Sequence, residues 1–224
     1  TPDGRAITVG GRIDRVDILK KGGKKYVRVV DYKSGAKEFA LSDVFYGLNL
    51  QMLVYLFAVW QGGRGEMENC QPAGILYMPA KDAVITAPRD TTPEDAEALK
   101  AARFRMNGLL LDDPDVLSAM EPGLGGVFIP VKATKSGYET RALATLSEIG
   151  AIKEHIDGLL RDMSDELLRG EIGAVPSKKS DALPCDYCQF ADICRRAADG
   201  ETKNILTMKK DEFYHAIKGA ADNA

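Results

Sequence analysis

Two carboxylates and a lysine near the start of the sequence have a spacing that places them together. Alternating β-branched and polar residues predict strands over residues 7–18 and 26–33, and Gly22-Gly23 between them is typical of a two-residue hairpin turn. In that register Asp14 lies directly opposite Asp31, with the two Cβ atoms roughly 5 Å apart. Lys33 shares their face, because side chains alternate along a strand.

Facing carboxylates of this kind repel one another, and a divalent cation between them removes the repulsion. Mg²⁺ prefers hard oxygen ligands, binds one or two carboxylates and keeps waters for a phosphate substrate. A lysine beside the cation can hold or deprotonate the attacking water and stabilise charge on the phosphate. Asp14, Asp31 and Lys33 therefore predict a Mg²⁺- or Mn²⁺-dependent phosphodiesterase, with a surface hairpin of ordinary solvated charges as the alternative.

A helix after the hairpin carries two more polar residues of interest. Ser42-Asp43 supplies an N-cap, and apolar residues recur at helical spacing over residues 44–59, before Gly62-Gly63. Gln51 and Tyr55 are four residues apart and share one helix face, so they can point at the hairpin together.

The rest of the chain predicts further elements around this core. Residues 73–78 and 83–86 indicate two paired strands, and residues 127–131 an edge strand. Residues 93–106 and 140–169 predict amphipathic helices, and the stretch 108–126 reads as loop. Together these patterns predict an α/β fold, a small mixed sheet flanked by helices, with a C-terminal cysteine-bearing extension.

Three motifs in order carry a resemblance to a known family. They are Gly11-Arg-Ile-Asp14, Asp31-Tyr-Lys33-Ser and Gln51-Met-Leu-Val-Tyr55. They closely resemble the G-x-I-D, D-Y-K-S and Q-x-x-x-Y motifs of the RecB-like PD-(D/E)xK nucleases. The sequence that flanks these motifs, including residues 46–53, is most similar to the C-terminal nuclease domain of the B subunit of AddAB-type helicase-nucleases.

The resemblance implies a restriction-endonuclease-like core and a role for each motif residue. Asp14, Asp31 and the Tyr32 carbonyl would ligate the metal, Lys33 would position or deprotonate water, and Gln51 and Tyr55 would orient the site. It also implies a cytoplasmic, nucleoid-associated DNA exonuclease in double-strand-break repair. A helicase-nuclease A subunit would deliver a single strand from a duplex end. Cleavage, expected on the 5′-ended strand, would leave 5′-phosphate and 3′-hydroxyl ends.

Four cysteines form the second constellation. Cys185, Cys188 and Cys194 are spaced C-x₂-C-x₅-C, which in a chain with no secretion signal indicates a metal or Fe–S site rather than disulfides. Cys70 is expected to be an ordinary buried thiol. The resemblance implies a [4Fe–4S] cluster in the full-length protein, with its fourth ligand upstream of this sequence. The cluster is then expected to be absent or incomplete in this fragment. The fragment is expected to divide into a nuclease core (1–175), which lacks its N-terminal segment, and a cysteine segment with the tail (176–224).

Composition is consistent with a globular nucleic-acid enzyme. The 224 residues are 45% hydrophobic and 28% charged, and no apolar run has the length of a membrane span, so no membrane partner is expected. The net charge is −3, yet residues 1–37 contain ten Lys or Arg and only four acids, a basic patch suited to a phosphodiester. A non-catalytic DNA-end-binding Fe–S scaffold and a free-standing Cas4-like exonuclease are the alternatives.

Overall fold

The computed structural model describes residues 4, 6–35, 37–80, 86–140, 142–196 and 200–221. The chain forms two compact units, which we call the sheet unit (Gly10–Phe39 and Leu50–Lys153) and the C-terminal unit (Thr1–Val9, Ala40–Asn49 and Glu154–Ala224). The functional division at residues 175/176 rests on the resemblance and stays a prediction.

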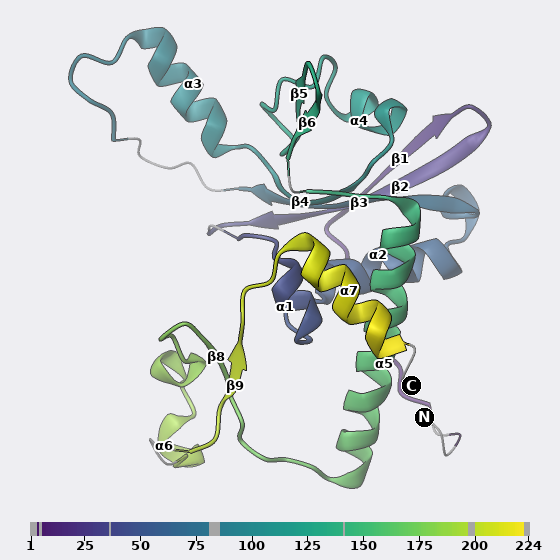
Figure 1. Ribbon diagram of the computed structural model, residues 1–224, viewed down its shortest axis with the longest axis vertical. Helices are drawn as coiled ribbons and strands as arrows, with labels where there is room; N and C mark the ends of the chain where they lie inside the picture. The colour runs from purple at the N-terminus through teal and green to yellow at the C-terminus, as the bar shows by residue number, and fades with distance from the viewer. Residues whose placement is uncertain are drawn as a thin grey trace. The chain divides into compact units, whose positions relative to one another are not determined.

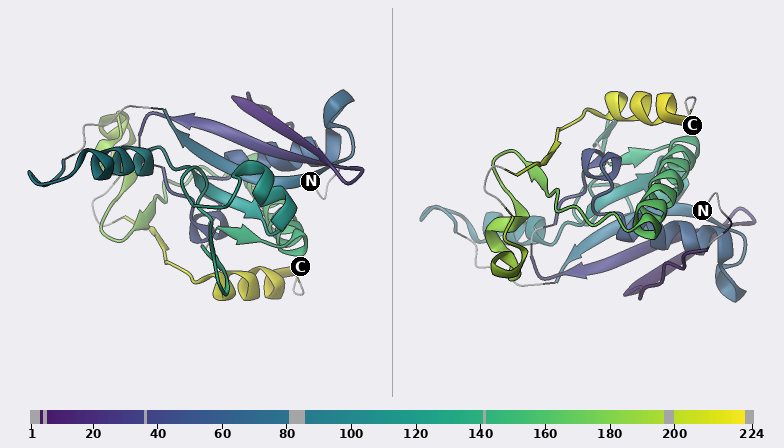
Figure 2. Two further views of the ribbon diagram at one scale, coloured as in Figure 1. Left: turned by 90° about the horizontal axis from the view of Figure 1, so that it is seen from above. Right: turned by 90° about the horizontal axis from the view of Figure 1, so that it is seen from below.

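Strands and helices are interspersed along the described chain (Figures 1 and 2). In chain order they are β1 (Arg15–Lys21), β2 (Lys24–Lys33), α1 (Leu41–Phe45), α2 (Gln51–Gly62), the 3₁₀ turn η1 (Gly65–Met67), β3 (Cys70–Pro79), α3 (Pro93–Arg103), β4 (Asn107–Leu111), α4 (Pro114–Met120), β5 (Lys132–Thr134), β6 (Gly137–Glu139), β7 (Leu143–Ala144), α5 (Leu146–Arg169), β8 (Ser177–Lys179), the 3₁₀ turn η2 (Pro184–Tyr187), α6 (Ala191–Cys194), β9 (Lys203–Ile205) and α7 (Lys210–Ala221).

A mixed sheet with strand order β1-β2-β3-β4-β7 is the framework of the sheet unit. Strands β1 and β2 are antiparallel, β2 and β3 parallel, β3 and β4 antiparallel, and β4 and β7 parallel. Helix α2 makes the crossover between the parallel strands β2 and β3 and packs against both. Figure 1 shows α2 on one side of the sheet and α4 with the β5–β6 hairpin on the other. The mixed sheet flanked by helices is confirmed.

On the face opposite α2, an apolar cluster packs between the sheet and the segments that cover it. It joins strand residues to α4 and to the segment after it: Val30, Leu76, Leu110, Leu117, Leu124, Ile129, Val131 and Leu143. Burial of such side chains supplies the main driving force that holds the layers together.

The hairpin register is confirmed. Arg15 pairs with Val30 and Lys21 with Lys24, so the turn consists of Gly22 and Gly23, whose φ angles are +57° and +74°. These left-handed angles are ones that glycine adopts without steric cost. The expected start of the first strand was wrong, because residues 6–13 form no strand and β1 begins at Arg15.

The single helix expected over residues 44–59 is two helices, α1 and α2. Gly47 and Asn49 adopt left-handed φ angles of +80° and +56°, which end α1 and start a new turn. The Asn49 side chain donates a 2.8 Å hydrogen bond to Asp43, stabilising this break. Apolar periodicity continued through the break and concealed it.

The expected loop over 108–126 contains β4 and α4. Asp113 caps α4 by accepting hydrogen bonds from the N–H groups of Asp115 (2.9 Å) and Val116 (3.2 Å), a signal that the sequence did carry. The expected strand over 127–131 was also wrong. The buried Glu121 carboxylate takes up the N–H groups of Val127, Phe128 and Ile129, which a strand would have given to a neighbour.

Other boundaries vary in agreement. Helix α3 starts as expected, with the Thr92 hydroxyl accepting from the Asp95 N–H at 3.1 Å, but it ends at Arg103. Helix α5 ends at Arg169 as expected but begins only at Leu146, after β7. Of the expected strand over 83–86, residues 83–85 lie outside the described residues and Thr86 is in no strand.

The C-terminal unit contains α1, the parallel pair β8–β9, α7 and the cysteine segment. Phe213 of α7 is fully buried, and the His155 ring stacks on Phe45 with centroids 5.5 Å apart. Among the described helices of both units, none is both long enough and apolar enough to span a bilayer.

Candidate active site

The hairpin brings Asp14 beside Asp31, as its register requires. Asp14 immediately precedes β1, so continuing the register from Arg15 and Val30 sets it opposite Asp31. Its Oδ2 accepts a 3.2 Å hydrogen bond from the Tyr32 peptide N–H. Asp14 is exposed whereas Asp31, 7% exposed, is buried, so the pair joins one solvent-accessible carboxylate to one shielded carboxylate.

Lys33 lies against the shielded carboxylate. Its ammonium forms an ion pair with Asp31 Oδ2 and lies 5.9 Å from the centroid of the Tyr77 ring, on the neighbouring strand β3. That buried Oδ2 atom accepts no hydrogen bond from any described residue, so the lysine is its one polar partner there. A buried carboxylate oxygen with one ionic partner can still accept a further ligand, such as a cation or a water.

The donor set suits a hard divalent cation. Asp14 and Asp31 supply carboxylate oxygens, and Tyr32, whose carbonyl is the third expected donor, directly follows Asp31 on β2. Over the described ranges, no three His, Cys, Asp or Glu side chains gather closely enough to share a metal. A cation here would therefore complete its shell with backbone carbonyl and water, which Mg²⁺ accepts readily.

Gln51 and Tyr55 form a pair on α2. The Gln51 Nε2 atom donates a 3.1 Å hydrogen bond to the Tyr55 hydroxyl, so the two side chains share one helix face as their four-residue spacing predicted. The Tyr55 ring lies directly against the Gly11 backbone, where any added Cβ would overlap the ring and hydroxyl. The first and third motifs of the sequence therefore touch in space, and glycine at position 11 makes that approach sterically feasible.

A family model described as the PD-(D/E)XK nuclease superfamily matches residues 3–195. The chain belongs to this nuclease superfamily. Three relatives, each named as the B subunit of an ATP-dependent helicase/deoxyribonuclease, are similar to it. The protein of Clostridium acetobutylicum is 38% identical over 94% of this chain and 19% of its own length. The protein of Clostridium botulinum (strain Hall) is 37% identical over 96% of this chain and 20% of its own length. The protein of Thermoanaerobacter sp. (strain X514) is 33% identical over 96% of this chain and 19% of its own length. The chain spans about a fifth of the length of these curated relatives.

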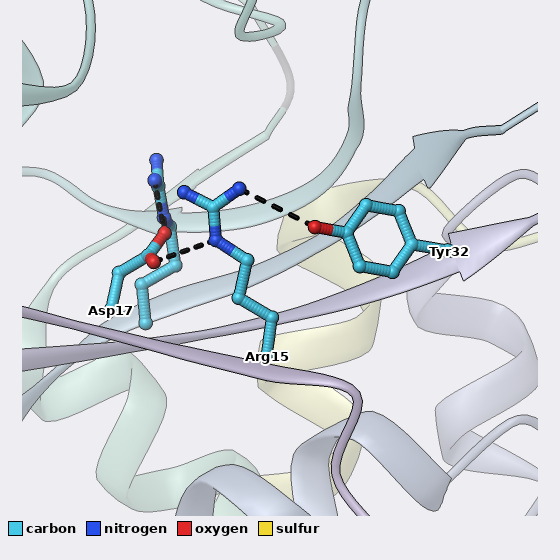
Figure 3. A network of polar contacts seen from close by, with 4 residues as sticks. Arg15, Asp17 and Tyr32 are labelled. Carbon is cyan, nitrogen blue, oxygen red and sulfur yellow. Dashed lines mark hydrogen bonds and ion pairs between the residues drawn. The ribbon is translucent and has the colours of Figure 1, made fainter.

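This PD-(D/E)XK nuclease has a polar network that the sequence patterns did not predict (Figure 3). Arg15 Nε donates to Asp17 at 2.7 Å and its Nη1 to the Tyr32 hydroxyl at 3.4 Å, while Arg28 binds Asp17 through Nε (3.1 Å) and Nη2 (2.5 Å). Burial would raise the pKa of Asp17, but these guanidinium hydrogen bonds outweigh it and lower that pKa. The hairpin register could have revealed the pair, because it sets Asp17 directly opposite Arg28.

The basic excess of the nuclease hairpin is partly neutralised by ion pairs. Lys20 and Lys21 directly precede the Gly-Gly turn. Lys20 forms an ion pair with Glu66 at 2.6 Å, and Lys21 forms one with Asp115 at 2.7 Å. Exposed pairs of this kind contribute little to stability, so these lysines can exchange partners when a polyanion arrives.

The three late cysteines of the nuclease do not assemble a metal site by themselves. Cys185 lies in η2, Cys188 follows it and Cys194 ends α6, and all three are free thiols. In the part of the chain that the structure describes, they do not converge as a ligand group, so their donor set does not fit a cluster as it stands. Cys70 is buried and free, as expected.

Proposed function

We propose that the chain is the metal-dependent deoxyribonuclease domain of a helicase–deoxyribonuclease B subunit. The observation that carries the proposal is the buried Asp31 Oδ2, which has Lys33 as its ionic partner, beside a second carboxylate positioned through Tyr32. Membership of the nuclease superfamily and the names of the relatives support a DNA substrate.

The site residues have separate roles in phosphodiester hydrolysis. Asp14, Asp31 and the Tyr32 carbonyl would hold Mg²⁺ or Mn²⁺, which when bound polarises the phosphoryl group and acidifies water. Lys33 is an ammonium paired with Asp31. It would donate hydrogen bonds to the attacking water or to a phosphate oxygen. The water oxygen attacks phosphorus and releases a proton to solvent. The bond from phosphorus to the 3′ oxygen breaks and that oxygen takes up a proton from water, leaving a 5′-phosphate and a 3′-hydroxyl. Gln51 and Tyr55, on α2, orient the residues of the site.

The larger context follows from the relatives rather than from this chain. Their names include an ATP-dependent helicase activity, and the chain covers only a fifth of their length. We infer that the domain acts on a single strand, the 5′-ended one, that an A subunit and helicase deliver from a duplex end in double-strand-break repair.

Cleavage of single-stranded DNA with Mn²⁺ tests the activity, by comparing the wild type with Asp31→Asn and Lys33→Met. Both variants should cut at least about a hundredfold more slowly. Lys218→Met is the matched control, because Lys218 is exposed on α7, outside the basic hairpin, and the variant should cut normally. Mn²⁺ binding, followed by electron paramagnetic resonance, should be lost in Asp31→Asn and kept in Lys33→Met. Undiminished cleavage by Asp31→Asn would refute the proposed site, and DNA binding without cleavage in the longer protein would favour a scaffold.

The cysteines support a second part of the proposal. We propose that Cys185, Cys188 and Cys194 hold a [4Fe–4S] cluster in the longer protein, with a ligand from outside this sequence. The clustered C-x₂-C-x₅-C spacing and the free state of the three thiols support this proposal. Anaerobically purified longer protein should contain iron and show a broad visible absorbance. Equal iron in a Cys188→Ser variant would count against this assignment.

A further inference from the structure

Four apolar residues form a row across the sheet at the end where Asp31 lies. Tyr32 pairs with Met78 in the β2–β3 register. The β3–β4 register ends at the pair Tyr77 and Asn107, and continuing it by one residue sets Met106, just before β4, beside Met78. The Met106 N–H then donates a 2.8 Å hydrogen bond to the Phe128 carbonyl. Three steps of one strand spacing thus separate Tyr32 from Phe128, a span of about 15 Å.

Tyr32, Met78 and Met106 of this row occupy the face opposite the carboxylates. Met78 and Met106 both pack against the apolar cluster that contains Val30, and Tyr32 is two residues beyond Val30 on the same face. Asp31 points to the other face. Nucleotides on this row would therefore flank the scissile phosphate instead of occupying the reaction centre.

The two ends of the row expose aromatic side chains on firmly held backbone. Phe128 is 60% exposed, yet its N–H donates to Glu121 at 2.8 Å and its carbonyl accepts from Met106. Its neighbour Ile129 is fully buried and also bound to Glu121. Tyr32, within strand β2, is 44% exposed. A rigid exposed aromatic loses little conformational entropy when a ligand contacts it.

Positive charge accompanies these aromatic residues. The Arg15 guanidinium contacts the Tyr32 hydroxyl, Arg103 and Arg105 are exposed just before Met106, and Lys132 is exposed shortly after Phe128. Aromatic faces that stack bases, combined with cations that follow phosphates, are the pattern of single-stranded nucleic-acid binding. Single-stranded nucleic acid is a better ligand for this row than an uncharged protein surface would be. Its bases can stack on the aromatic rings while its phosphates contact the nearby arginines and lysine.

We infer that Tyr32 and Phe128 form a base-stacking ledge for the single strand beside the cleaved bond. The DNA identity of the ligand rests on the proposed function. Because the ledge lies away from Asp31 and Lys33, it strengthens substrate binding and leaves the chemical step to the other face.

Binding of a fluorescein-labelled oligothymidylate, measured by anisotropy with Ca²⁺ and no Mg²⁺ or Mn²⁺, tests the ledge without cleavage. Phe128→Ala should weaken binding about tenfold. Phe190→Ala is the matched control, because Phe190 is 59% exposed and lies in the C-terminal unit, and it should bind normally. Phe128→Leu keeps apolar bulk but loses the aromatic face, so it should bind as weakly as Phe128→Ala.

A tryptophan reporter provides direct evidence of stacking. Phe128→Trp should bind at least as tightly as wild type and show fluorescence quenching on oligonucleotide addition that exceeds the change from the native Trp60. In cleavage assays Phe128→Ala should raise KM with little change in kcat.

The outcomes separate the ledge from the catalytic proposal. A chain that cuts DNA but binds equally well with Phe128→Ala or Phe128→Leu overturns the ledge alone, as does a wild type that binds no oligonucleotide. A chain that needs Phe128 for binding but never cuts supports the ledge and overturns the proposed activity. Equal melting temperatures of the variants confirm that folding is unaffected.

Discussion

The Tyr32 peptide N–H donates a 3.2 Å hydrogen bond to Oδ2 of Asp14. This bond ties the carboxylate that precedes β1 to the backbone between Asp31 and Lys33 on β2. The two strands of one hairpin therefore hold the carboxylates in a fixed relation before any cation binds, which is the kind of preorganisation that favours metal binding.

Asp14→Asn tests whether the charge of this carboxylate matters beyond its hydrogen bond. The amide oxygen can still accept from the Tyr32 N–H, while the negative charge is lost. We expect cleavage to fall at least about a hundredfold and the free energy of unfolding to change by less than about 0.5 kcal/mol. Asp112→Asn, at an exposed carboxylate outside the site, should be active. Normal activity in Asp14→Asn would remove Asp14 from the metal site.

Gly11→Ala tests the contact between the first and third motifs. The added Cβ would overlap the Tyr55 ring, whereas nothing lies within 4 Å of a Cβ at Gly10. Gly11→Ala should destabilise the protein by about 1–3 kcal/mol and slow cleavage, because Tyr55 must move. Gly10→Ala is the control and should be neutral in both urea denaturation and cleavage assays. Equal behaviour of the two variants would contradict the close approach.

Glu121→Gln tests the buried clamp beneath the ledge. Burial would raise the pKa of Glu121, but the N–H groups of Ile129, Val127 and Phe128 outweigh it and lower that pKa. Gln replaces one accepting oxygen with a donor that faces those N–H groups, so we expect a loss of about 2–3 kcal/mol. The same lowered pKa means that stability is lost as pH falls below the ordinary glutamate range, and Glu121→Gln should flatten that part of the profile. Glu139→Gln, at an exposed position, should leave both measurements unchanged.

His155 predicts a second pH dependence in the C-terminal unit. Burial lowers the pKa of His155 below its ordinary 6.5, against the smaller raising effect of the Phe45 and Val44 carbonyls. The unfolded chain then binds the proton more readily than the folded chain, so stability should fall as pH drops below about 6.5 and level off below the folded pKa. His155→Phe, which keeps the stacking on Phe45, should remove this dependence in thermal melts between pH 5 and 8. A dependence that persists in His155→Phe would assign it to other groups.

Local patterns predicted the parts of the fold that local interactions determine. The Gly22-Gly23 turn fixed the hairpin register residue by residue, and through it the proximity of Asp14 to Asp31. The N-cap of α3 was equally readable, because Thr92 acts within its own first turn. The four-residue spacing of Gln51 and Tyr55 predicted that they share one helix face, and their hydrogen bond shows that they do.

Longer-range interactions account for the errors. Residues 127–131 have the composition of a strand, but Glu121 binds their N–H groups, and no pattern within the segment announces that partner. The break after α1 depends on left-handed backbone at Gly47 and Asn49, which apolar periodicity masked. The approach of Tyr55 to Gly11 joins residues 44 positions apart and needed the folded chain to be seen.

The arrangement β1-β2-α2-β3 has a consequence for how the protein acquires its activity. All five motif side chains lie between Asp14 and Tyr55, on one hairpin and the crossover helix that follows it. Contacts within this part of the chain involve no residue of the later strands, so they can form before those strands are synthesised. We therefore expect a nascent chain to assemble the reaction centre as soon as β3 emerges, before β4 and β7 complete the sheet.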